Sequence, residues 1–172
     1  MVDMDSATLT IRPALESDRA VLEDLIADCY ATVYPGWYEE ETLQDALPAM
    51  LRIDPALLNS GRYLVARAGN VIAGCGGWSA NAPGKTPSED AIGHIRHFAT
   101  RPDAMGKGVG GKILEHCISE ATSSGLSALK CFSSLAAEGF YARHGFVKLD
   151  NVNVMLGSGA YFPAVLMERR LG

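Results

Sequence analysis

The feature that most constrains this chain is a cluster of glycines between a strand-like segment and an amphipathic helical segment. Four glycines fall within residues 106–111, just after Arg101-Pro102-Asp103 breaks the preceding apolar pattern. A junction of strand, turn and helix exposes unpaired backbone N–H groups and the positive end of a helix dipole at one point. The sequence therefore predicts an anion-binding turn here.

Two common phosphate-binding motifs compete for these glycines. Gly106, Gly111 and Lys112 match the P-loop spacing, but the next residue is Ile113, which has no hydroxyl for Mg²⁺. Gly106, Gly108 and Gly111 also satisfy G-x-G-x-x-G, yet no convincing acidic residue follows about 20 residues later at a second strand end. A nucleoside triphosphatase and a dinucleotide site are both disfavoured.

The hydrophobic pattern along the rest of the chain predicts one α/β domain over residues 1–172. Helices are expected from about residue 17, over 40–47 with Pro48 as the stop, from 109 to a stop at Gly125, and over 135–144. Strands are expected at 9–12, 63–67, 71–78, 91–100, 127–132, 146–156 and 161–169, and a polar loop at 81–90.

Composition excludes some partners. The net charge of -5 over 172 residues argues against binding nucleic acid or an anionic membrane through the overall field. No run of about 20 apolar residues occurs, so we expect a cytoplasmic protein without a membrane span. The 4 cysteines have no C-x-x-C spacing, which predicts reduced, buried thiols.

Two longer strings carry a family resemblance. Residues 98–110, from Phe98 through Arg101-Pro102 to the glycines, resemble the acetyl-CoA-binding segment of the GNAT superfamily of N-acetyltransferases. Ser134-Leu135 followed by residues 140–146 resembles the second signature of that family. The resemblance implies the GNAT acyl-CoA N-acyltransferase fold, an α/β fold whose mixed central β-sheet has about six to seven strands and helices on both faces.

The same resemblance implies acetyl-CoA as cosubstrate and no metal. Where the family usually has Arg or Gln this chain has Met105, and where it often has Asn this chain has Ala136. These departures remove side-chain contacts, but the Met105 amide can still serve a phosphate. Lys107, Arg101 and Arg143 are candidates for the other phosphates or solvated surface charges. The implied cosubstrate-binding residues are Phe98, Ala99, Thr100, Met105, Gly106, Lys107, Gly108, Val109, Gly110, Gly111, Ser134 and Arg143.

The implied reaction is direct attack of a primary amine on the thioester in a ternary complex. Tyr141 resembles the tyrosine that protonates the leaving thiolate, although it could instead pack in the core. His94 is the first candidate for the base, and a histidine that only hydrogen-bonds across the sheet is the simpler interpretation. Strand alternation places its rival His97 on the opposite face and Phe98 on the face of His94, unless a bulge shifts the register.

Aromatic residues are candidates for the acceptor site, although such residues more often pack in cores. The expected partners are a small-molecule or peptide amine, with no nucleic acid and no membrane, and a homodimer is compatible with the sequence. A non-catalytic acyl-CoA-binding module and a Mg²⁺-dependent nucleotide enzyme are the alternative functions. The aromatic candidates are Tyr30, Tyr34, Trp37, Tyr38, Trp78, Tyr161 and Phe162.

Overall fold

The computed structural model describes residues 8–80, 91–156 and 159–172, and the loop expected at 81–90 lies outside them. Within the described residues, seven strands form one sheet. The strands are β1 (Leu9–Pro13), β2 (Tyr63–Ala68), β3 (Val71–Ser79), β4 (Ile92–Thr100), β5 (Ala128–Ser134), β6 (Val147–Met155) and β7 (Tyr161–Arg170). The helices are α1 (Arg19–Val33), α2 (Glu40–Met50), α3 (Pro55–Leu58), α4 (Val109–Ser123) and α5 (Glu138–Arg143), with 3-10 turns η1 (Glu16–Asp18) and η2 (Pro102–Ala104).

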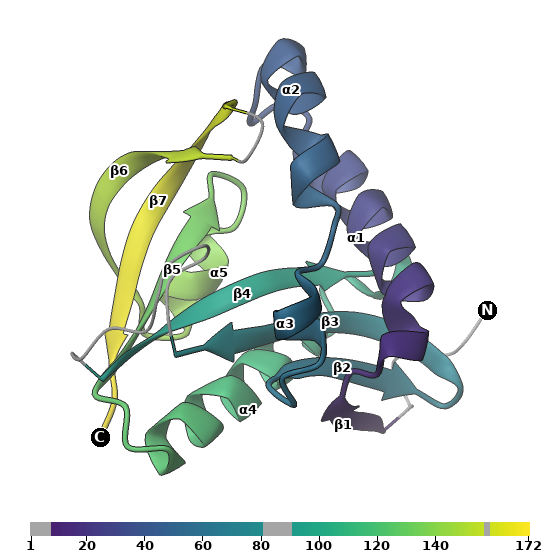
Figure 1. Cartoon of the computed structure of the whole chain (residues 1–172), viewed down its shortest axis with the longest axis vertical. Coiled ribbons are helices and arrows are strands. Elements are labelled where there is room, and N and C mark those ends of the chain that lie inside the picture. Colours follow the sequence, from purple (N-terminus) through teal and green to yellow (C-terminus); the bar gives the residue numbers. More distant parts are fainter. Residues whose placement is uncertain (1–7, 81–90, 157–158) are drawn as a thin grey trace.

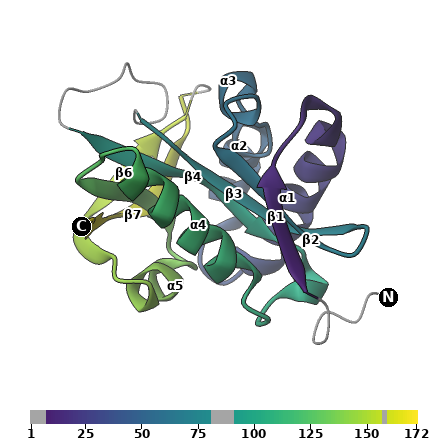
Figure 2. The same ribbon diagram turned by 90° about the horizontal axis from the view of Figure 1, so that it is seen from below.

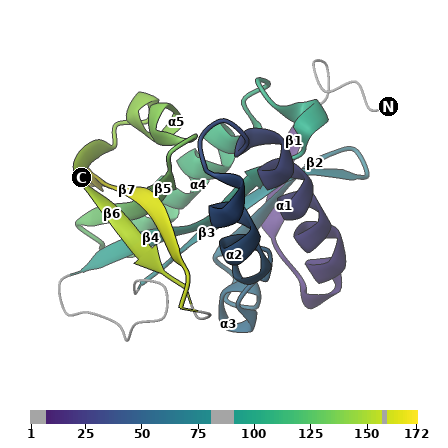
Figure 3. The same ribbon diagram turned by 90° about the horizontal axis from the view of Figure 1, so that it is seen from above.

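The strand order is β1-β2-β3-β4-β5-β7-β6, and all neighbours are antiparallel except β4 and β5. In Figure 1, β2, β3 and β4 run across the view, whereas β5, β6 and β7 rise steeply from them. Helix α4 lies across the face seen from below (Figure 2), and α1 and α2 cover the face seen from above (Figure 3). The predicted mixed sheet with helices on both faces is confirmed.

Two amphipathic helices build a core on either face of the sheet. In α1 the buried residues Leu22, Leu25, Ile26, Cys29 and Tyr30 recur at helical spacing. In α4 the buried residues Val109, Ile113, Leu114, Cys117 and Ala121 do the same and pack against the opposite side. We refer to these as the α1-side core and the α4-side core.

The segment between α1 and β2 differs from the prediction. Pro48 was expected to end α2, but the helix continues to Met50, and the Leu51 N–H donates to the Leu47 carbonyl at 3.0 Å. A proline removes one N–H donor from a helix, and its ring crowds the preceding turn. Both effects are tolerated here because Pro48 lies close to the end of the helix. Helix α3 was missed: Asp54 caps it through the Ala56 N–H, and Pro55 starts it.

Helix α5 is also shorter than expected. The sequence predicts a helix over 135–144, whereas α5 spans Glu138–Arg143. Residues 135–137 form a turn, in which the Ala137 N–H donates to the Ser134 carbonyl at 3.1 Å. This turn separates the end of β5 from the helix.

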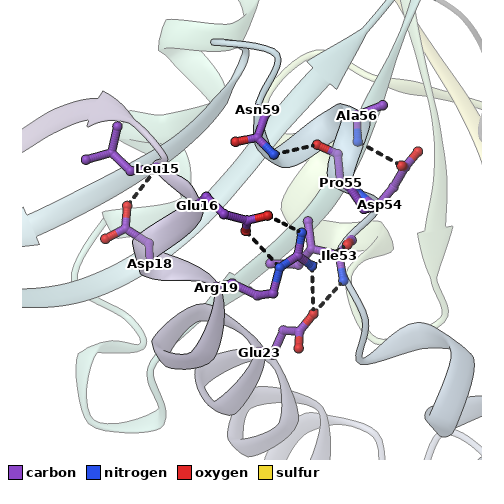
Figure 4. Close-up of polar contacts among 10 residues, drawn as sticks. All are labelled: Leu15, Glu16, Asp18, Arg19, Glu23, Ile53, Asp54, Pro55, Ala56 and Asn59. Carbon is purple, nitrogen blue, oxygen red and sulfur yellow. Dashed lines mark hydrogen bonds and ion pairs between the residues drawn. The ribbon is translucent and has the colours of Figure 1, made fainter.

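A polar network fixes the loop between α2 and α3 against the start of α1 (Figure 4). The Arg19 guanidinium donates to the Ile53 carbonyl at 2.8 Å, and the Glu23 carboxylate accepts from the Ile53 N–H at 3.0 Å. Glu16 and Glu23 both pair with Arg19, at 2.8 and 3.4 Å. Because both backbone groups of Ile53 are bonded, the neighbouring residues of the loop are held in one position.

Candidate functional site

The sheet opens between β4 and β5. In the described part of the chain the two strands pair in parallel over three residue pairs, the last of which joins His94 to Lys130. Beyond that pair, residues 95–100 stay with β3 and residues 131–134 stay with β7, so the strands diverge. A cavity of about 640 Å³ occupies this opening. It is the candidate functional site.

A bulge in β4 shapes one wall of the cavity. Between two ladder pairs, Gly76 of β3 faces both His97 and Phe98, which is one extra residue on β4. His97 has a φ of 56°, and its carbonyl accepts a 2.7 Å hydrogen bond from the Tyr63 hydroxyl. A Cβ on Gly76 would lie 2.4 Å from the Phe98 ring. Glycine is therefore required where this ring crosses β3.

The bulge corrects the predicted faces of β4. Phe98 packs against the α4-side core, whereas Ala99 belongs to the α1-side core. His97 contacts Met50 of α2 and therefore lies on the α1 side. Ile95 lies in the α4-side core, so alternation puts His94 on the α1 side together with His97. The faces expected from regular alternation therefore do not hold, because the bulge that the sequence left open shifts the register.

The cavity passes through the plane of the sheet. Tyr34 and Phe162 line it and belong to the α1-side core, whereas Cys131 and Tyr141 line it and belong to the α4-side core. A ligand entering from one face can therefore meet a ligand bound from the other within the opening.

Aromatic rings form the wall on the α1 side. Tyr30 and Tyr34 stack with ring centroids 4.6 Å apart, and Tyr34 also packs against Phe162 at 5.6 Å. Burial raises the pKa of Tyr34 above the usual phenol range, so its hydroxyl stays protonated. The rings give this end of the cavity an apolar wall with hydroxyl groups.

His97 is the histidine that lines the cavity. Its Nε2 lies 2.6 Å from the Met50 carbonyl oxygen. Because a carbonyl only accepts, Nε2 carries the proton in the neutral ring and Nδ1 keeps its lone pair. Burial lowers the pKa of His97, the Met50 hydrogen bond opposes that shift, and the Arg96 charge adds to it. The ring is therefore neutral near pH 7 and can accept a proton.

His94, the first candidate for the base, does not line the cavity. Its Nδ1 is buried without a hydrogen-bond partner among the described residues. Burial lowers the pKa of His94, and the charges of Lys130 and Arg96 act in the same direction. His94 thus has the chemistry of a base without access to this cavity.

Tyr141 lies in the wall of the cavity on the α4 side. The residue is only 6% exposed and packs edge-on against Phe98, Phe140 and Phe146. Burial raises the pKa of Tyr141 well above the usual phenol range. Tyr141 therefore presents a neutral O–H donor, while its ring also serves the packing role considered from the sequence.

The structure brings most of the predicted cosubstrate-binding residues to one place. Gly106, Lys107 and Gly108 are exposed between Met105 and Gly110, whereas Val109 is buried in the α4-side core. Residues of this set that line the cavity are Phe98, Ala99, Thr100, Met105, Gly110, Ser134 and Arg143.

The glycine turn has the predicted backbone geometry. Gly106 and Gly108 have φ of 78° and 80°, and Gly108 is the N-cap of α4. Within the described residues, the N–H groups of Gly106, Gly108, Gly110 and Gly111 donate no backbone hydrogen bond. The Met105 N–H, in contrast, already donates to the Pro102 carbonyl at 3.4 Å, so its amide is less available than expected.

The remaining aromatic candidates divide by role. Tyr38 has a structural role, because its hydroxyl donates to the Pro163 carbonyl at 2.7 Å and accepts from the Leu135 N–H at 2.8 Å. Trp78 is buried in the α4-side core beneath the Arg62 guanidinium. Trp37 and Tyr161 are exposed and do not line the cavity. Of the seven candidates, Tyr30, Tyr34 and Phe162 line it.

Three polar groups of the cavity were not singled out from the sequence. Arg52 and Asp54 line it from the loop between α2 and α3, and Arg96 lines it from β4. The missed helix α3 concealed the first two, because its cap fixes the course of the loop. For Arg96 the available signal was its place two residues before Phe98 on the predicted strand.

Other expectations concern thiols, metals and membranes. Cys29, Cys75, Cys117 and Cys131, all within the described residues, are free and buried. Burial raises the pKa of Cys75 and of Cys131 to about 12, so these thiols are protonated. Among the described residues, no group of three or more His, Cys, Asp or Glu side chains is arranged to hold a metal. None of their helices is both long and apolar enough to cross a bilayer.

Solved structures share this fold over nearly the whole chain. A GCN5-related N-acetyltransferase from Rhodopseudomonas palustris superposes with a TM-score of 0.75 at 23% identity, covering 96% of this chain and 97% of the other. PaiA N-acetyltransferase from Thermoplasma acidophilum, solved with coenzyme A, superposes with a TM-score of 0.69 at 16% identity, covering 95% and 99%. The open seven-stranded sheet is therefore the fold of the GNAT acetyltransferases.

The sequence comparison leads to the same family as the fold. The family model of the acetyltransferase (GNAT) domain matches residues 59–148, and the chain belongs to this family. An IAA acetyltransferase from Azospirillum brasilense is 34% identical over 68 residues. That match spans 40% of this chain and 40% of the relative's own length.

Proposed function

We propose that this chain is an acetyl-CoA-dependent N-acetyltransferase that transfers the acetyl group to a primary amine by direct attack. The observation that carries the proposal is the cavity that crosses the sheet, with the glycine turn beside one end and Tyr141 in its wall. We also propose that residues 1–172 act as one domain, since β1 and β7 belong to the same sheet, and that the protein is cytoplasmic.

The pyrophosphate of acetyl-CoA binds the unpaired N–H groups of the turn in this proposal. Gly106 and Gly108 have positive φ at the N-terminus of α4, where the helix dipole also favours an anion. Main-chain groups of residues 98–100 serve the pantetheine arm, and Ser134 and Arg143 line the same route. The Met105 side chain lines the cavity, but its N–H does not bind phosphate in this proposal because it already donates to the Pro102 carbonyl.

The chemical step makes a C–N bond and breaks the C–S bond of the thioester. A lysine-like amine has a pKa near 10.4, so a base must take its proton before attack. The departing thiolate then accepts a hydrogen bond from the Tyr141 hydroxyl. Because burial raises the pKa of Tyr141, full proton transfer to the thiolate is uphill and solvent completes it.

We propose His97 rather than His94 as the group that accepts the amine proton. Both histidines have lowered pKa values, but His97 lines the cavity and keeps Nδ1 free of hydrogen bonds to the described residues. In this proposal His97, which lies in the bulge of β4, takes the role that the sequence first assigned to His94.

Binding and turnover distinguish this enzyme from a non-catalytic module. Acetyl-CoA at about 100 times its Kd should raise the melting temperature by roughly 5–10 °C, whereas ATP with Mg²⁺ should not. A panel of primary amines should then give acceptor-dependent release of CoA. If acetyl-CoA stabilises the protein and no amine releases CoA, the non-catalytic module is the correct function.

A further inference from the structure

A partly buried arginine, Arg96, lies at the α1-side end of the cavity. The Arg96 side chain is 13% exposed, and its nearest carboxylate, Asp54, stays 4.0 Å away. Its hydrogen bond to a described residue goes to the Ser79 hydroxyl at 3.2 Å. A guanidinium has five N–H donors and stays charged at any physiological pH, so most of its hydrogen-bonding capacity is unused.

The Asp54 carboxylate only partly compensates the charge of the Arg96 guanidinium. One oxygen of its carboxylate accepts the Ala56 N–H as the cap of α3, and its side chain is 52% exposed. The hydrogen bonds of Arg19 and Glu23 to Ile53 fix the backbone next to Asp54 (Figure 4). A second cation, Arg52, lines the cavity from the same loop.

The charges at this end favour an anion although the whole chain carries -5. Two arginines and one carboxylate, Arg52, Arg96 and Asp54, line this end, and His97 beside them is neutral. A partly buried guanidinium whose counterion stays 4.0 Å away still has N–H donors to offer, and a carboxylate that accepts two of them is the group that satisfies it best.

The order of residues along β4 limits the spacing of the acceptor's groups. Arg96 and His97 are adjacent on β4, and both line the cavity. A single small molecule can present a carboxylate to Arg96 and its amine to His97 only when the two groups are close together. The stacked rings of Tyr30 and Tyr34 then face the rest of the molecule.

We infer that the acceptor is an amino acid with an apolar side chain, whose carboxylate binds Arg96 and whose amine is the acetylated group. The inference rests on the proposed function and specifies its substrate class. Arg96 is a specificity-determining residue, and Tyr30, Tyr34 and Phe162 provide the surface for the side chain.

The test compares acceptors that differ in the carboxylate alone. L-phenylalanine, L-phenylalaninamide and phenethylamine, with a parallel leucine series, are assayed for CoA release. The acid should exceed its amide and amine by about 10–100-fold in kcat/KM, the range for a hydrogen-bonded charge pair. Arg96→Gln should abolish the preference for the acid, mainly by raising its KM, and Arg96→Lys should retain part of the preference. The control Arg67→Gln, which lies outside the cavity, should leave the preference unchanged.

A second readout separates this inference from the proposed function. All variants should keep the melting shift with acetyl-CoA, which shows an intact fold and donor site. Equal use of the acid and the amine, or a preference that survives Arg96→Gln, overturns the inference while acetyl transfer stands. If no acceptor releases CoA, the proposed function fails, and the melting temperature of the CoA-saturated protein with phenylalanine or phenethylamine decides the inference by binding alone.

Discussion

At the scale of single residues, burial determines what the side chains of the cavity can do. Tyr141 is surrounded by three aromatic rings and keeps its proton, which makes it a hydrogen-bond donor rather than a base. His97 loses its proton for the same reason and becomes an acceptor. One physical effect, desolvation, thus produces the two complementary roles.

Tyr141→Phe tests the donor role. It removes the hydroxyl and keeps the ring contacts, so the melting temperature should change little. We expect kcat to fall by about 100-fold or less, because the phenol stabilises the thiolate without full proton transfer. Steady-state kinetics with acetyl-CoA checks this. An unchanged kcat together with an unchanged melting temperature would assign Tyr141 to packing.

His97→Gln and His94→Gln form a matched pair for the base. A glutamine amide at position 97 can still donate to the Met50 carbonyl, so the α2 contact survives while the basic nitrogen is lost. The acid limb of the kcat/KM pH profile should disappear in His97→Gln, with a rate loss of about 100-fold or more. His94→Gln should keep the limb. The reverse result would restore the base first assigned from the sequence.

The residues of the turn and Tyr141 were predictable because their positions are encoded locally. The glycine spacing fixes a strand, turn and helix junction within a few residues, and the structure has it at Gly106 and Gly108. The face of His97 was not predictable, because the bulge depends on the Tyr63 hydroxyl from a distant strand and on space above Gly76.

At the scale of elements, helix α4 connects the turn to the α4-side core. Val109 and Ile113 of its first turns are buried, whereas the N–H groups of Gly106 and Gly108 donate no backbone hydrogen bond within the described residues. The packing of α4 thereby anchors the turn. Gly125 ends the same helix at a φ of 84°, where the Leu126 N–H donates to the Ala121 carbonyl at 3.1 Å.

Gly108→Ala and Gly125→Ala separate stability from binding. Both glycines have positive φ, and an added Cβ meets nothing within 4 Å at either position. Each substitution should cost about 1 kcal/mol, or roughly 2–4 °C in melting temperature. Only Gly108→Ala should also weaken acetyl-CoA binding, by about 10-fold, as measured by calorimetry. Equal Kd values in the two variants would remove the turn from the binding site.

The errors of the sequence prediction between α1 and β2 arise where a local signal and another physical effect conflict. Pro48 predicted a helix end, yet apolar contacts of Leu47 and Met50 with the α1-side core keep the last turn helical. Asp54-Pro55 is a helix-start signal, but four residues are too few for a periodic pattern. The consequence reached the candidate site, because Arg52 and Asp54 lie between these two elements.

At the scale of the whole molecule, acid should destabilise the fold through its histidines. His94 and His97 both have lowered pKa values, so the unfolded chain takes up protons before the folded one. The free energy of unfolding should therefore fall as pH drops below the unfolded histidine pKa of about 6.5. Urea unfolding at pH 7.5 and 5.5 measures this. The His94→Gln, His97→Gln double variant should lose much less, and an equal loss would assign the effect to other groups.

The three-pair ladder between β4 and β5 divides the sheet into halves of four and three strands. Few main-chain hydrogen bonds join the two parts, and the Tyr38 hydroxyl ties the segment between α1 and α2 to Leu135 and Pro163 of the three-strand part. A ligand bound in the opening contacts both parts of the sheet and stabilises them together. Its binding should therefore slow amide hydrogen exchange in residues 95–100 and in residues 131–134, although these two segments do not pair with each other.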